Sequence, residues 1–305
     1  MLRIGEIHDV QNHFHEALTY YEQALDSFRA TKQRRGEATA LTKIGSIFER
    51  QGRREAAAVS LRDALSLFTK VPNSPAYADA LLTLGRVSAW LGSREEASRL
   101  FERAVDQYTQ LANVQGLGLA RIQLGLMRIN DGSTQEGLQL LQHAFEDATN
   151  RHDSGQTLGA LLALGDARWI LDDPAAAGAH YEQALALVEQ KPQISTEAGL
   201  RYRLAALYGV TGQQEKGMGF SKRAVTLYQS LRDSSGEAAS WALLASLHQA
   251  LKQNQQADES EQRALSIYRQ RQLVVHPVRS SVDPPLSGSR GRPTSPAESQ
   301  SPARP

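Results

Sequence analysis

The feature that most constrains the fold of this chain is an internal repeat with a period of 40 residues. A small residue recurs in seven successive copies, with no insertion between them, at Gly5, Gly45, Gly85, Gly125, Gly165, Ala205 and Ala245. An unbroken alanine column follows 19 residues later, at Ala24, Ala64, Ala104, Ala144, Ala184, Ala224 and Ala264. Periods of about 20 to 50 residues are typical of solenoids, propellers and arrays. The sequence therefore predicts one elongated body built from stacked copies.

Each copy contains two apolar patterns with helical spacing. In the second copy the first pattern is Leu41, Ile44, Gly45 and Phe48, and the second is Ala57, Leu61, Ala64, Leu65 and Phe68. Side chains at i, i+3, i+4 and i+7 share one face of a helix. A short polar turn, here RQGRRE, separates the two patterns, and no β-branched alternation suggests strands. The unit is predicted to be an antiparallel helix pair that stacks on its copies.

The small column lies inside the first predicted helix, where glycine is unfavourable. Glycine in a helix interior costs roughly 0.5–1 kcal/mol relative to alanine. A small residue at one fixed position of every copy indicates that another backbone approaches the helix closely there.

The pattern resembles the tetratricopeptide repeat. In the third copy it runs Leu84-Gly85, then Ala97, then a bulky Phe101, then Ala104. Two departures are the period, which is about 34 residues in the common repeat, and the missing proline near the end of the second helix, which is replaced by Thr69, Thr109 and Thr149. The longer period is similar to that of the 40-residue subclass found in signalling adaptors and in bacterial regulators with MalT-like sensor regions.

The resemblance implies an all-α, right-handed superhelical solenoid of seven antiparallel helix pairs over residues 1–272. The first pair is expected to be truncated at its N-terminus, so that Leu2, Ile4 and Ile7 form an open end suited to self-association. Residues 273–305 are rich in Pro, Ser and Arg and bury little apolar area, so they are predicted to be a disordered tail.

Composition limits the function. A net charge of +1 provides no general basic field, so no nucleic-acid partner is expected. There is no cysteine, no signal-peptide pattern and no long apolar stretch, so a cytoplasmic location and no membrane partner are expected. We find no nucleophile–base arrangement, and the pair His13 and His15 lacks further metal ligands. No enzyme activity, cofactor or metal is therefore expected.

Function is expected in a groove. The resemblance implies that the first helix of each unit lines a concave surface, whose middle is apolar. The predicted partner-binding residues are Leu82, Arg86, Trp90, Ile122, Leu126, Ile129, Leu162, Asp166, Trp169 and Tyr202. An alternative for some of them is packing between neighbouring units, and Trp241 is expected in the core.

Two functions fit this sequence. One is a scaffold or adaptor that binds a peptide or helix of a protein partner. The alternative is a regulatory or sensor region of a larger signalling or transcription-regulating system.

Overall fold

A computed structural model describes residues 1–68 and 74–270, and the predicted tail at 273–305 lies outside them. The described part contains helices and turns but no strand. Fourteen helices follow one another: α1 (Leu2–Val10), α2 (Phe14–Ala30), α3 (Arg34–Arg50), α4 (Arg54–Phe68), α5 (Pro75–Trp90), α6 (Arg94–Gln110), α7 (Val114–Asn130), α8 (Thr134–Asn150), α9 (Ser154–Ile170), α10 (Pro174–Gln190), α11 (Ile194–Val210), α12 (Gln214–Leu231), α13 (Ser234–Ala250) and α14 (Asn254–Gln270).

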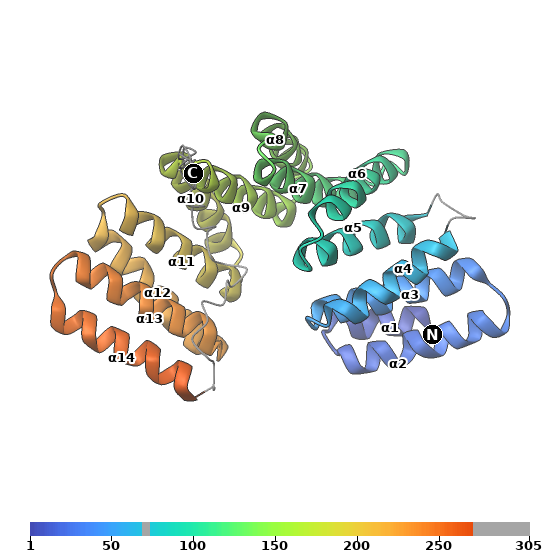
Figure 1. Cartoon of the computed structure of the whole chain (residues 1–305), viewed down its shortest axis with the longest axis horizontal. Coiled ribbons are helices and arrows are strands. Elements are labelled where there is room, and N and C mark those ends of the chain that lie inside the picture. The colour runs from blue at the N-terminus through green and yellow to red at the C-terminus, as the bar shows by residue number, and fades with distance from the viewer. Residues whose placement is uncertain (69–73, 271–305) are drawn as a thin grey trace, which may run out of the picture.

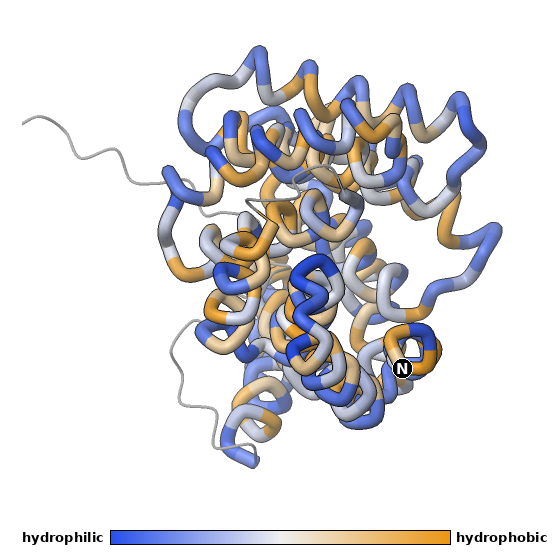
Figure 2. The backbone as a smooth tube through the Cα atoms, turned by 90° about the vertical axis from the view of Figure 1, so that its right-hand side faces the viewer, coloured by the Kyte–Doolittle hydropathy of each residue, from blue (hydrophilic) through white to orange (hydrophobic). Residues whose placement is uncertain are grey.

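The helices form an arch of stacked antiparallel pairs (Figure 1). Each helix packs against its neighbours in sequence, and α5 and α7 also pack against the odd-numbered helices on both sides. In the middle of the arch, α5 and α7 lie on its inner side and α6 and α8 on its outer side (Figure 1). The turns at the edge of the array are hydrophilic, and apolar segments lie where helices meet (Figure 2). The solenoid of helix pairs predicted from the repeat is confirmed.

The turn inside each pair needs one residue in the left-handed region. Four of these turns use glycine, at Gly52, Gly92, Gly132 and Gly212, with φ between 73° and 90°. Glycine adopts this conformation without the steric cost that a Cβ imposes. The three-residue turns therefore hold the two helices of a pair antiparallel at a constant register.

The small column is explained by the second helix of the same pair. A Cβ built on Gly85 would lie 2.5 Å from Cε1 of Phe101, and one on Gly165 would lie 2.4 Å from Cε1 of Tyr181. At these two positions the close approach is by a bulky side chain, which corrects the expectation of a backbone contact. At Gly125 the expected backbone contact is present, since the nearest atom is the backbone oxygen of Gly137, at 2.9 Å. The two units with alanine in the column have Ser221 and Glu261 at the bulky position. Glycine thus occurs where the partner is a large apolar side chain.

A second set of glycines makes room for bulky side chains at the junctions between successive pairs. A Cβ on Gly36, Gly116 or Gly236 would lie 2.1 to 2.4 Å from the ring of Phe28, Tyr108 or Tyr228, respectively, which ends the preceding pair. Where the preceding aromatic is replaced by Ala148 or Val188, the glycine is replaced by a larger residue. These glycines therefore let an aromatic ring fill the junction between successive pairs.

The two ends of the described array are less covered. Ile4 is 43% exposed and Ile7 is 58% exposed on α1, whereas the equivalent residues of α3 are buried. At the other end Trp241 is only partly buried, so the expectation that it lies in the core is wrong. Arg263 of α14 stacks on its ring at 4.5 Å. Because α13 and α14 are the last described pair, no further pair covers this ring.

Candidate functional site: the inner face of the arch

Ion pairs between odd-numbered helices mark the inner face. Lys43 contacts Glu6 at 3.0 Å, Arg86 contacts Glu49 at 3.1 Å and Arg203 contacts Asp166 at 3.0 Å, each joining successive odd helices. The partners are 37 residues apart, which is the 40-residue period less about one helical turn. We use "inner face" for the side of the odd helices that carries these columns.

Charges on the inner face of α1, α3 and α5 neutralise one another. In addition to the pairs above, Arg50 donates hydrogen bonds to Asp9 and Asn12 of the first pair. Arg86 donates from two nitrogens to both carboxylate oxygens of Glu49, at 3.1 and 3.3 Å. A bidentate pair of this kind fixes both side chains. The front of the inner face is therefore polar and already paired.

The inner face of α7, α9 and α11 is different. Some of the repeat positions that carry charged residues in α1, α3 and α5 are apolar in these helices. They are occupied by Leu126, Ala163 and Ala206. Leu126, Leu162, Trp169 and Tyr202 are partly exposed. The sequence prediction of an apolar middle therefore describes a surface that the structure leaves partly open.

One ion pair interrupts this apolar surface. Asp166 accepts a hydrogen bond at 2.6 Å from the Tyr181 hydroxyl of α10 and one at 3.0 Å from Nε of Arg203. The Arg203 side chain is 15% exposed. Burial opposes its charge, but Asp166 and then Tyr181 outweigh burial and raise the pKa of Arg203. Burial, followed by the charge of Asp166, raises the pKa of Tyr181. The network thus stays an ion pair with a neutral tyrosine.

Three predicted groove residues have little surface to offer a partner. Leu82 is 4% exposed, Ile122 is 7% exposed and Ile129 is 4% exposed, and all three belong to core clusters. Ile122 and Ile129 lie in one cluster with residues of α8 and α9, so they pack between units, as the alternative interpretation allowed.

Trp90 is accessible but lies at the end of α5. It is 50% exposed, and the guanidinium of Arg54 lies 4.5 Å from its ring centroid. A cation over an aromatic face is a favourable contact. One face of the Trp90 ring is therefore already occupied by Arg54. Arg86 is also occupied, by its ion pair with Glu49. The remaining predicted groove residues that are partly open lie on α7, α9 and α11.

Sequence reasoning missed one inner-face column. Lys43 and Arg203 lie two residues before the small column and supply the basic partners of the pairs with Glu6 and Asp166. Opposite charges recurring at a spacing of 37 residues would have revealed this column.

Neither a metal site nor a membrane span is found within residues 1–68 and 74–270. No three His, Cys, Asp or Glu side chains come together there in a way that could hold a metal ion. None of the helices described is both long and apolar enough to cross a bilayer.

Comparisons with known proteins identify a similar repeat and similar folds. A tetratricopeptide repeat model matches residues 1–70 and 37–110. No curated protein matches the sequence. A STAND signal-transduction ATPase with a tetratricopeptide repeat sensor, from Pyrococcus horikoshii, is similar in structure with a TM-score of 0.71 at 13% identity, over 89% of this chain and 42% of that protein.

Two Rap proteins are also similar in structure. One, complexed with Competence and Sporulation Factor, has a TM-score of 0.66 at 14% identity, over 88% of this chain and 74% of that one. The other, the conjugation gene regulator of plasmid pLS20 in complex with the Phr* peptide, has a TM-score of 0.62 at 15% identity, over 89% and 73%. At these identities the likeness is one of fold.

Proposed function

Because the chain is a tetratricopeptide repeat protein, we propose that it binds a peptide or a helix of a protein partner along the inner face of α7, α9 and α11. The observation that carries this proposal is the change along the inner face from paired charges to partly exposed apolar side chains at Leu126, Leu162 and Tyr202. Open apolar surface on an otherwise polar array is typical of binding sites.

The composition of the face indicates which ligands fit. Trp169 and Tyr202 offer aromatic surface, and aromatic side chains are common anchors in interfaces. Asp166 and Arg203 already satisfy each other, so a ligand gains little from a charge at that point. A peptide with apolar anchors and little charge in its central part fits best. The Rap proteins with a similar fold were solved with Competence and Sporulation Factor and with the Phr* peptide, which supports a peptide as the ligand class.

The test uses a displayed library of random peptides selected on the whole chain. Selected peptides are then titrated against a double variant, Leu126→Glu with Ala206→Glu, which places charge on the inner face. The matched control, His143→Glu with Gln183→Glu, adds charge on the exposed outer side of α8 and α10. We expect the first variant to weaken binding at least about tenfold, since charge in an apolar contact costs more than 1.4 kcal/mol, and the control to bind as the wild type does.

Equal binding to both variants, with both variants folded, would refute the inner-face assignment. Far-ultraviolet circular dichroism and melting of each variant establish folding before the titration.

A second candidate function is that of a sensor region in a larger signalling system. It is favoured by the similarity to the STAND protein, of which this chain spans 42%. A sensor must respond to its ligand by changing shape. Small-angle scattering of the chain with and without a selected peptide would measure this response, and an unchanged profile at saturation would contradict it.

A further inference from the structure

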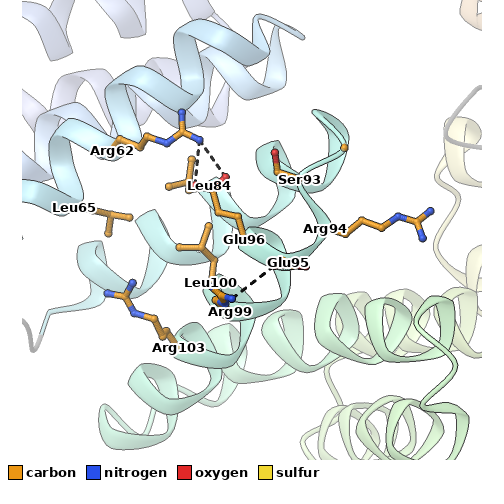
Figure 3. A pocket seen from close by; sticks show the side chains of 11 residues that line it. Arg62, Leu65, Leu84, Ser93, Arg94, Glu95, Glu96, Arg99, Leu100 and Arg103 are labelled. Carbon is orange, nitrogen blue, oxygen red and sulfur yellow. Dashed lines mark hydrogen bonds and ion pairs between the residues drawn. The ribbon is translucent and has the colours of Figure 1, made fainter.

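The outer side of the arch carries a second surface, a cleft of about 870 Å³ between α4 and α6. Its apolar part is formed by the partly exposed Leu65 of α4, over a floor of Leu84 of α5 and Leu100 of α6, which are only 2% and 5% exposed (Figure 3). Because α4 and α6 belong to successive pairs and α5 lies between them, the two outer helices form walls and α5 contributes to the floor.

The cleft is long and open rather than enclosed. Along α6 its lining runs from Arg94 to Arg103, about 14 Å at 1.5 Å per residue. Glu96, Leu100 and Arg103 follow one another at i, i+4 and i+7 and therefore share one face of α6. Small-molecule sites bury most of their ligand, whereas an open wedge of this length fits an elongated segment such as a helix of about three turns.

One ion pair crosses the cleft and occupies Glu96, whose side chain is 39% exposed. Arg62 of α4 donates to both oxygens of Glu96 at 3.1 Å, and Glu96 also accepts a hydrogen bond from the Ser88 hydroxyl at 3.0 Å. Figure 3 shows this pair at the end of the cleft near the α5–α6 turn. Glu96 is thus satisfied, and it fixes α4 to α6 at that end.

The remaining charge on the cleft is mainly positive. Arg99 is 77% exposed and lies 3.7 Å from Glu95, which is 91% exposed, so water screens this pair. Arg103 donates to the uncharged hydroxyl of Tyr77. In Figure 3 Arg94 points away from the cleft, so we do not assign it a contact. The cations that remain available to a ligand on the cleft are therefore Arg103, which has an uncharged partner, and Arg99, whose pair with Glu95 is exposed to water, one helical turn apart.

We propose that this cleft binds an amphipathic helix of a partner protein whose apolar stripe is flanked by acidic residues. The apolar stripe packs mainly on Leu65, above the buried Leu84 and Leu100, and the acidic flank lies against Arg99 and Arg103. This occupant complements both the shape and the charge of the cleft. The site is on the opposite side of the arch from the inner face and does not depend on a ligand there.

The test uses two synthetic helical peptides with the same leucine stripe, one flanked by glutamates and the other by lysines. Fluorescence anisotropy with the full chain measures the affinity of each. We expect the glutamate peptide to bind at least about tenfold more tightly than the lysine peptide and to lose affinity as salt rises. Equal affinities of the two peptides would overturn the proposal.

Variants locate the binding. The double substitution Arg99→Glu with Arg103→Glu is expected to weaken binding of the glutamate peptide at least about tenfold. The control Arg34→Glu with Arg35→Glu makes the same change in net charge at exposed positions of α3 and should leave binding within about twofold. Equal losses in both variants would show attraction by net charge alone and would overturn the proposal.

Two further variants keep the result decisive. Arg99→Gln with Arg103→Gln removes the cations without adding repulsion to α6, so it serves if the charge reversal melts early, and it should also weaken binding. The inner-face variant Leu126→Glu with Ala206→Glu should leave binding of the glutamate peptide unchanged. Loss of binding in that variant would place the peptide on the inner face and reject the outer cleft.

Discussion

The substitution Gly85→Ala tests the packing that defines the repeat. The added Cβ would lie 2.5 Å from Cε1 and 2.7 Å from Cδ1 of Phe101, and the ring is only 1% exposed, so it has no free space to enter. Alanine gains roughly 0.5–1 kcal/mol over glycine in a helix interior, whereas overpacking a core costs about 1–3 kcal/mol. We expect the free energy of unfolding to fall by about 1–2 kcal/mol, because the steric cost exceeds the helical gain.

The same substitution at Gly219 is the matched control. Gly219 lies within α12, and a Cβ built there meets no atom within 4 Å. Gly219→Ala should therefore stabilise the chain by about 0.5–1 kcal/mol. Urea unfolding followed by circular dichroism measures both variants. In a Phe101→Ala background the penalty of Gly85→Ala should largely disappear, since the two sites are then uncoupled. If Gly85→Ala stabilises the chain as Gly219→Ala does, the steric explanation of the small column is refuted.

Three further outcomes are expected. Trp169→Ala should weaken a peptide selected on the chain by about 2 kcal/mol, the scale of an interface anchor; unchanged titration curves would remove it from the binding face. Arg203→Ala should lower the free energy of unfolding by roughly 1–3 kcal/mol, because it leaves Asp166 without its cation; an unaltered urea midpoint would mean that water replaces the pair. Burial and then the charge of Arg168 lower the pKa of His180 below its ordinary 6.5, so the unfolded chain binds the proton first and stability should fall as pH drops below about 6.5. In His180→Gln the difference in unfolding free energy between about pH 7.5 and about pH 5 should shrink, and an equal difference in both proteins would contradict this.

The structural features that every copy of the repeat shares could be predicted, because each copy places the same type of residue in the same environment. Glycine at Gly85 and alanine at Ala104 recur in step, and the structure buries both residues. The identity of the atoms that demand glycine at Gly85 could not be read in the same way, because the distance to Phe101 depends on how the two helices cross. The two copies with alanine in place of this glycine also have Ser221 or Glu261 in place of the bulky apolar residue. This joint change would have identified the contact from the sequence.

The sequence predicts a groove on the odd-numbered helices, but which of its residues are exposed depends on how neighbouring helices pack. Ile122, Leu126 and Ile129 are separated by three or four residues on α7 and read as one stripe, yet only Leu126 is partly open. The packing of α7 against α8 and α9 covers the other two. For Trp241 the error has the opposite sign, because a residue predicted to be buried is partly exposed. Its repeat position is buried when another pair follows, but Trp241 lies in the last described pair. Whether such a residue is buried depends on its position within the stack of pairs. A repeat pattern alone does not give that position.

Protection of backbone amides on peptide binding tests the central claim most directly. A peptide selected on the chain is added at saturation, and hydrogen–deuterium exchange is followed along the whole array. The inner-face proposal predicts slower exchange in Val114–Asn130, Ser154–Ile170 and Ile194–Val210, which are α7, α9 and α11, and little change in the outer helices α8, α10 and α12. Protection confined to the outer helices, with α7, α9 and α11 unchanged, would contradict it.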